Sequence, residues 1–155
     1  MPASKDSKRK QWQRVISPRK PQTNAFQCTA AVCEELVKNG SRKQLDPGTI
    51  IFHKGDKPKG VYLVLSGRVA LSAGDDPTRI TRVAGERSLL GLPATVRNRA
   101  YSLTAETVTP VEVCVISPNR FRELLREDTS LGTTVITILA EEISVLRKLA
   151  VYKLK

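Results

Sequence analysis

Short runs of β-branched and aromatic residues, each closed by turn residues, fill the middle of the chain. Residues 49–52 follow Pro47-Gly48, and a second run at residues 61–65 precedes Ser66-Gly67. This two-residue turn predicts a β-hairpin with residues 68–71. Turn residues at 74–77 and 109–110 predict two further pairs, with strands at residues 79–83, 103–108 and 111–116. Regularly spaced strands with glycine-rich turns are typical of an antiparallel roll or barrel.

Helical periodicity replaces this pattern near both ends. Residues 25–38 carry apolar side chains at helical spacings and end at Asn39-Gly40, which suits a helix C-terminus. Ser117 before Pro118 predicts the start of a second short helix. From residue 133 onward one apolar row recurs at steps of three and four residues: Ile136, Leu139, Ile143, Leu146 and Ala150. This row predicts a coiled-coil seam and therefore a homodimer.

A second apolar row widens the stripe on this last helix. It consists of Val135, Ile138, Val145 and Leu149. We expect the second row to pack on the roll while the first row meets another copy of the chain, because a helix of about 20 residues spans about 30 Å. The alternative is that the whole stripe docks on its own domain.

The opening strands resemble a known module. Gly48, the turn at Gly55-Asp56, the run at 61–65 and the turn at Ser66-Gly67 are similar to the first half of the cyclic-nucleotide-binding domain of the catabolite-activator (Crp/Fnr) type. Cyclic-nucleotide-dependent kinases and cyclic-nucleotide-gated channels share this module. The resemblance covers roughly residues 26–155. It implies a mainly β fold with flanking helices, an antiparallel β-roll (jelly roll, double-stranded β-helix) followed by a long C-terminal helix.

The polar, basic composition of residues 1–24 and the apolar rows of the last helix, together with the resemblance, predict the organisation of the chain. We expect a flexible basic tail at residues 1–24, a β-roll with short flanking helices at residues 25–132 and a dimerisation helix at residues 133–155. In the bacterial regulators this helix leads into a DNA-reading helix-turn-helix domain, whereas the sequence here stops at Lys155. We therefore expect the usual DNA output to be missing from this polypeptide.

Residues 85–105, GERSLLGLPATVRNRAYSLTA, lie where that family keeps its ligand cassette. There a short helix presents N–H groups to the cyclic phosphate, an arginine neutralises the phosphate and a glutamate accepts the ribose hydroxyl. Arg99 matches the arginine. The resemblance implies a ligand-binding set of Gly91, Leu92, Arg99, Ala100, Tyr101 and Ser102. Arg87 and Tyr101 are further candidates for the pocket rim.

The cassette glutamate can be aligned in two ways. Either Gly85-Glu86 is the cassette pair, at an unusually long interval from Arg99, or Gly91 is the cassette glycine and Leu92 replaces the glutamate. We favour the second alignment. A leucine cannot accept the ribose hydroxyl, and an unpaired donor in a closed site costs about 1–3 kcal/mol. We therefore expect no tight binding of cyclic AMP or cyclic GMP, although a different small anionic or apolar ligand is compatible with the same cavity.

An exposed basic turn is the alternative interpretation of Arg97, Asn98 and Arg99. The tail raises a similar choice. Residues 1–24 hold seven lysines and arginines against Asp6, a net charge of +6 within the formal net charge of +11. The tail is either a solubilising leader or an arm that touches nucleic acid. Any DNA binding should be weak and indifferent to sequence, because no reading helix is present.

Several classes of function find no support in the sequence. No CxxC motif or cysteine–histidine cluster accompanies Cys28, Cys33 and Cys114, so we expect them to be small residues on buried faces and expect no metal or other cofactor. No nucleophile–base spacing and no glycine-rich phosphate loop with a lysine occurs, so we predict that the protein is not an enzyme. Without a transmembrane run or a signal segment, we expect a cytoplasmic protein with no membrane partner.

The sequence therefore predicts a non-catalytic regulatory or sensory domain that signals through its C-terminal helix and has a degenerate ligand cassette. Two alternatives stay open. One is a structural or adaptor module whose pocket is vestigial, and the other is a nucleic-acid-associated protein that acts through its basic arm.

Overall fold

The computed structural model describes residues 27–73 and 80–153, and within them the side chains of 27–73 and 82–141. In that part of the chain eight strands form two four-stranded sheets, ordered β1-β8-β3-β6 and β2-β7-β4-β5. Every pairing within them is antiparallel, which confirms the mainly β roll. The strands are β1 (Ser41–Leu45), β2 (Ile50–Phe52), β3 (Val61–Ser66), β4 (Val69–Ser72), β5 (Ile80–Ala84), β6 (Leu89–Leu90), β7 (Thr104–Thr107) and β8 (Val111–Ile116).

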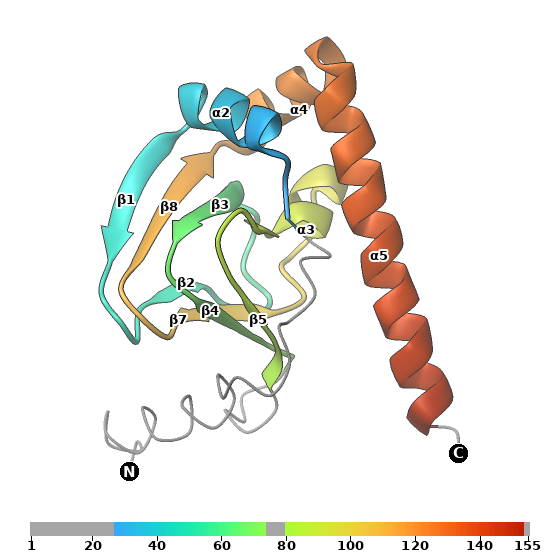
Figure 1. Cartoon of the computed structure of the whole chain (residues 1–155). Helices are drawn as coiled ribbons and strands as arrows, with labels where there is room; N and C mark the ends of the chain where they lie inside the picture. The colour runs from blue at the N-terminus through green and yellow to red at the C-terminus, as the bar shows by residue number, and fades with distance from the viewer. Residues whose placement is uncertain (1–26, 74–79, 154–155) are drawn as a thin grey trace.

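Helices flank the roll on one end and one side. Helices α2 (Ala30–Lys38) and α4 (Pro118–Glu127) lie at one end, the short helix α3 (Leu92–Arg97) follows β6, and α5 (Thr129–Lys153) extends along one side of the roll (Figure 1). At 25 residues, α5 is about 37 Å long. The expected basic tail at residues 1–24 and hairpin tip at residues 74–77 lie outside the described residues.

Strand β3 stands between two hydrophobic clusters. Its alternate residues Val61 and Leu63 belong to a cluster shared with α2, α4 and α5, which we call the helical cluster. Tyr62 and Val64 belong to a second cluster between the two sheets, the roll cluster. Because both faces of this strand are buried, its sequence is a continuous apolar run rather than an alternating one.

Two of the predicted hairpins are wrong: β3 does not pair with β4, and β7 does not pair with β8. β3 pairs with β6 and β8, so both of its edges are occupied and β4 joins the other sheet beside β5 and β7. For the same reason β7 and β8 do not pair across Thr109-Pro110, because β8 lies between β1 and β3. The turn residues were identified correctly, but each turn carries the chain from one sheet to the other. The pair formed by β4 and β5 is confirmed.

The two turns that carry the chain between the sheets, at Ser66-Gly67 and Thr109-Pro110, pack against each other. Gly67 has φ +89°, and a Cβ at this position would collide with the backbone oxygen of Pro110. The backbone N–H of Arg68 donates to Thr109 Oγ1 at 2.9 Å, and the N–H of Val108 donates to the carbonyl of Arg68 at 2.9 Å. Glycine is therefore required at position 67 for two reasons: its backbone conformation is left-handed, and the turn at Thr109-Pro110 leaves no space for a Cβ.

The helix boundaries differ from the predicted ones at two N-termini. α2 begins at Ala30 rather than at residue 25, because Thr29 caps it through its side-chain oxygen and Gln27 forms a bridge with Ser88 instead. α5 begins at Thr129 rather than at residue 133, because the Asp128 carboxylate accepts from the N–H of Ser130 at 2.9 Å. α4 begins as predicted, with Ser117 as its cap and Pro118 in its first turn.

Cysteines account for part of the buried surface, as predicted. Cys28 and Cys114 are buried and Cys33 is half-buried, and all three thiols are free. Burial raises the pKa of Cys28 from its ordinary value of 9.0 to about 12, and burial also raises the pKa values of Cys33 and Cys114. The folded chain therefore keeps protons that the unfolded chain releases above pH 9.0.

Alkaline solution should consequently weaken the fold. Since the unfolded state binds fewer protons, Cys28 alone should lower the free energy of unfolding by about 1.4 kcal/mol per pH unit between its two pKa values. Urea titrations between neutral pH and about pH 10, with a thiol reductant present, measure this loss. The Cys28→Ala variant should show a shallower decline. Equal declines in the two proteins would mean that the Cys28 thiol is not desolvated.

Candidate functional site

The cassette segment forms a tight turn, a short helix and a second turn. Gly91 and Asn98 flank α3 in left-handed conformations, with φ values of 76° and 52°. Gly91 has no side chain with which to cap the helix, and Pro93 near its start lacks an N–H. The first turn therefore presents fewer N–H groups to an anion than a helix without proline would. The predicted short helix is present at the predicted place.

Neither candidate for the ribose acceptor lies inside the roll. Leu92 is 0% exposed and packs in the helical cluster. Glu86 lies in an exposed turn before β6, and its backbone carbonyl accepts from the side-chain amide of Gln27 at 2.8 Å. In both alignments the position that would hold the carboxylate faces away from the space between the sheets.

Tyr101 fills the interior of the roll beside the cassette. The residue is 2% exposed, and its ring stacks on Phe52 with a centroid separation of 3.9 Å and an interplanar angle of 15°. Phe52 in turn packs against Tyr62 at 5.7 Å. On the cassette side, a Cβ at Gly91 would lie 2.7 Å from Cε1 of Tyr101, so the ring occupies space that only glycine leaves free.

The hydroxyl of Tyr101 is held as firmly as its ring. It donates to the carbonyl of Gly60 at 3.0 Å and accepts from the N–H of Lys59 at 2.9 Å. The backbone of Tyr101 pairs with the same loop, because its N–H donates to Asp56 and its carbonyl accepts from Gly55. Burial raises the pKa of Tyr101, so the phenol stays protonated. Sequence reasoning placed this residue at the pocket rim, whereas it lies inside the roll.

The remaining cassette residues lie on the surface. Arg97, Asn98, Arg99, Ala100 and Ser102 are all exposed. Within the part of the chain that the structure describes, the Arg99 guanidinium has no hydrogen-bond or ion-pair partner, and only its backbone N–H is bonded, to Ala94 at 3.0 Å. This geometry matches the exposed basic turn that the sequence left as an alternative.

The cassette helix is linked to the helices behind it. The Thr95 hydroxyl donates to the carbonyl of Gly91 at 2.8 Å, and Arg122 of α4 donates to the carbonyl of Thr95 at 3.3 Å. α4 packs on α5 in turn, and Phe121, Leu124 and Leu131 meet in the helical cluster. These contacts connect α3 to α5 through α4.

Helix α5 divides its apolar residues between two environments. Val135 and Ile138 are buried in the helical cluster, as expected for the second row. Ile136 of the first row is 69% exposed, and Leu139 is half-buried at the edge of the cluster. The backbone of Ile143, Leu146 and Ala150 is helical, but their side chains lie outside the described part.

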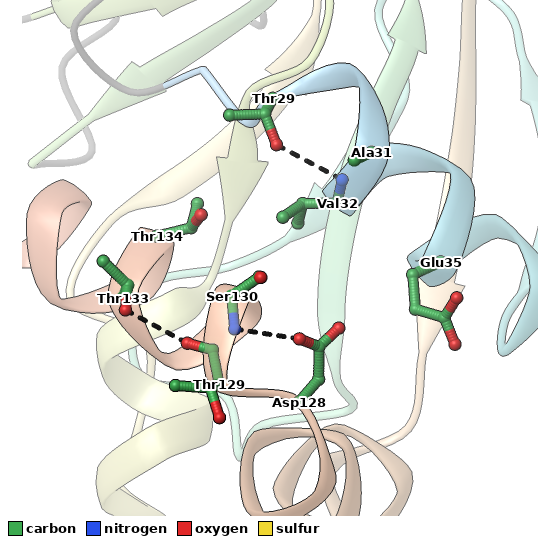
Figure 2. A pocket seen from close by; sticks show the side chains of 9 residues that line it. All are labelled: Thr29, Ala31, Val32, Glu35, Asp128, Thr129, Ser130, Thr133 and Thr134. Atoms are coloured by element: carbon green, nitrogen blue, oxygen red, sulfur yellow. Dashed lines mark hydrogen bonds between the residues drawn. The ribbon is translucent and has the colours of Figure 1, made fainter.

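A groove that the sequence did not predict lies between α2 and the start of α5. It has a volume of about 580 Å³, and Figure 2 shows side chains from both helices around it. Five of its nine lining residues carry hydroxyl groups, and Glu35 and Asp128 are the acidic members: Thr29, Ala31, Val32, Glu35, Asp128, Thr129, Ser130, Thr133 and Thr134. Three of these groups are already used to cap or brace the helices, at Thr29, Asp128 and Thr133. The paired hydroxyl residues at 129–130 and 133–134 were the available sequence signal.

Two kinds of feature are absent from the described residues. No group of three or more histidine, cysteine, aspartate or glutamate side chains there could hold a metal ion. None of the helices described is both long and apolar enough to cross a bilayer.

Relatives of the chain were found among curated proteins and solved structures. Mouse patatin-like phospholipase domain-containing protein 7 is 26% identical over 102 residues, which are 64% of this chain and 8% of that protein. The crystal structure of the Thermus thermophilus catabolite activator protein superposes with a TM-score of 0.70 at 21% identity, covering 81% of this chain and 60% of that one. The chain therefore spans only part of the length of these relatives.

A second solved structure supports the same fold. The c-di-GMP-responsive regulator CLP of Xanthomonas campestris has a TM-score of 0.63 at 23% identity, and the match covers 76% of this chain and 59% of that one. The family model of the cyclic nucleotide-binding domain matches residues 42–128, more than half of the chain. This segment runs from β1 to the residue that caps α5, and so includes both sheets and the cassette. The chain belongs to the cyclic nucleotide-binding domain family.

Proposed function

We propose that this protein is a non-catalytic regulatory domain whose roll is closed by its own Tyr101 and which acts through α5 as a homodimer. The observation that carries the proposal is the stacking of Tyr101 on Phe52 between the sheets, against the cassette glycine. A ring in this position competes with any ligand for the space beside the cassette. A cytoplasmic location remains a prediction, as does weak DNA contact through the basic tail.

Three separate features support the proposed degeneracy of the cassette. Leu92 supplies no acceptor for a hydroxyl, Pro93 removes an N–H donor, and Tyr101 fills the interior. Arg99 alone could still make a charge-assisted contact with a phosphate. Loss of one or two contacts worth about 1.5–3 kcal/mol each weakens binding by roughly tenfold to several thousandfold.

Isothermal titration tests this part of the proposal. We expect no submicromolar binding of cyclic AMP or cyclic GMP, because the acceptor is absent and the ring must first leave the roll. The Arg99→Ala variant is the matched control, since it removes the one surviving ligand group without touching the core. Submicromolar binding by the natural chain that disappears in Arg99→Ala would contradict a closed roll.

The dimer part of the proposal rests on the exposed face of α5. Ile136 is 69% exposed, the most exposed of the large apolar side chains that the structure describes, and it lies in the row that predicts a coiled-coil seam. We expect light scattering to give twice the chain mass, and Ile136→Lys with Leu139→Lys to give the mass of one chain.

Thr137→Lys is the control for this experiment. It introduces one lysine, against two in the double variant, next to Ile136 on α5 and at an exposed hydroxyl position. A dimer that survives the double substitution, or that Thr137→Lys disrupts equally, would place the interface elsewhere.

A further inference from the structure

Two cysteines meet at the start of α2. Cys28 precedes the capping residue Thr29, and Cys33 is the fourth residue of the helix. Side chains at these two positions commonly pack on each other across a helix start, in the arrangement called the hydrophobic staple. Here both sulfurs belong to the helical cluster, and the N–H of Cys33 donates to the carbonyl of Thr29 at 3.0 Å. Each thiol is among the causes that shift the pKa of the other, in agreement with neighbouring side chains at these two positions.

An arginine lies beside this pair. The N–H of Cys28 donates to the carbonyl of Arg87 at 2.8 Å, and the N–H of Arg87 donates to Val64 of β3 at 2.7 Å. Arg87 has φ 67°, so the turn that carries it is tightly specified. Its positive charge lowers the pKa of both thiols against the larger effect of burial, which raises them. Arg87 thus partly offsets the effect of burial, and the pair reacts through the small thiolate fraction that remains.

The two thiols are not equivalent. Cys28 is buried, whereas Cys33 is half-buried. Cys33 is therefore the thiol that a reagent in solution can reach. Cys114 provides a contrast, because its thiol donates to the backbone carbonyl of Leu36 at 3.8 Å.

We propose that Cys28 and Cys33 form a dithiol site that a small disulfide such as oxidised glutathione converts into an intramolecular disulfide. The Cys33 thiol loses its proton to solvent, and the thiolate attacks one sulfur of glutathione disulfide. A mixed disulfide forms at Cys33, and the first glutathione leaves and takes up a proton. Cys28 then loses its proton and attacks the Cys33 sulfur, which releases the second glutathione. Two thiols are oxidised by two electrons, and one glutathione disulfide is reduced to two thiols.

The second step becomes easier once the first has occurred. The neighbouring Cys33 is one of the causes that raise the pKa of Cys28, and the mixed disulfide removes the charge on Cys33. The staple also keeps the two sulfurs next to each other, so the second attack is intramolecular. The resulting bond would fix the start of α2, which borders the groove against α5.

Intact-mass measurement of the full chain after incubation with oxidised glutathione tests the proposal. We expect the natural chain to lose two hydrogens without retaining glutathione, and Cys114→Ser to do the same. Cys28→Ser should instead stop at one glutathione adduct on Cys33, and Cys33→Ser should react at neither position. Thermal unfolding of each variant verifies that it is folded.

Two results would overturn the proposal. The first concerns the natural chain under conditions in which free cysteine is oxidised. Its mass would either stay unchanged or would increase by a glutathione adduct that it keeps. The other is loss of the two hydrogens in Cys28→Ser or Cys33→Ser, which would assign the bond to Cys114. Peptide mapping after blocking of free thiols identifies the cysteines involved in every case.

Discussion

Replacing Phe121 with alanine should lower the free energy of unfolding by about 3–5 kcal/mol, a large share of the stability of a domain of this size. Phe121 of α4 is 0% exposed and lies in the helical cluster, where it packs with residues of α2, β8 and α5. Its removal leaves a cavity among elements that are distant in sequence and cannot easily collapse together. Urea titration measures the change as a lower midpoint at an unchanged slope.

Leu125 offers the matched comparison on the same helix. Its side chain is only partly buried at the edge of the helical cluster, so Leu125→Ala should cost clearly less than Phe121→Ala. Similar losses for the two variants would show that burial within this cluster does not determine the stability of the helical end.

Replacing Tyr101 with alanine should destabilise the roll by a comparable amount, about 3–5 kcal/mol, and should also open it. The variant loses the stack on Phe52 and both hydrogen bonds of the hydroxyl, which join Lys59 and Gly60 to the cassette. An apolar cavity of this kind admits a small aromatic molecule. We therefore expect phenol to raise the melting temperature of Tyr101→Ala, since a ligand that binds only the folded state stabilises it.

Tyr101→Phe separates the two contributions. It keeps the ring and removes the hydroxyl, so it should cost about 1–3 kcal/mol and should show no response to phenol. A melting temperature of Tyr101→Ala that phenol leaves unchanged, in a folded protein, would mean that the roll closes over the missing ring. Such a result would also weaken the proposal that Tyr101 keeps ligands out.

The positions of the strands in the sequence could be predicted more securely than the pairing of one strand with another. The runs that became β3 and β8 are visible because each is buried on both faces. A turn such as Ser66-Gly67 specifies a change of direction, but nothing local states whether the next strand returns to the same sheet. β1 was missed because its sequence, Ser-Arg-Lys-Gln-Leu, is largely exposed and has no apolar pattern. Its place depends on pairing with β8, which local sequence cannot show.

The cassette could be located from its sequence, but the directions of its side chains could not. Leu92 was expected where a ligand group would lie, and it packs in the helical cluster because Gly91 turns the chain just before it. Tyr101 was expected in the ligand-binding set and at the pocket rim, and the size of its ring was the signal that it lies inside the roll. In the resembled family small residues follow the arginine, and a large ring two residues after Arg99 needs space that the roll interior provides.

The pairing of β1 with β8 has a consequence for the synthesis of the protein. Ser41 pairs with Val115 and Leu45 with Val111, and no other strand borders β1 within the described residues. A ribosome adds about 5–20 residues per second, so for several seconds β1 has emerged while its only partner does not yet exist. During that interval its polar sequence protects it, because a strand rich in charged and hydrophilic residues is a poor template for aggregation. The first strand to be made is thus among the last to be placed.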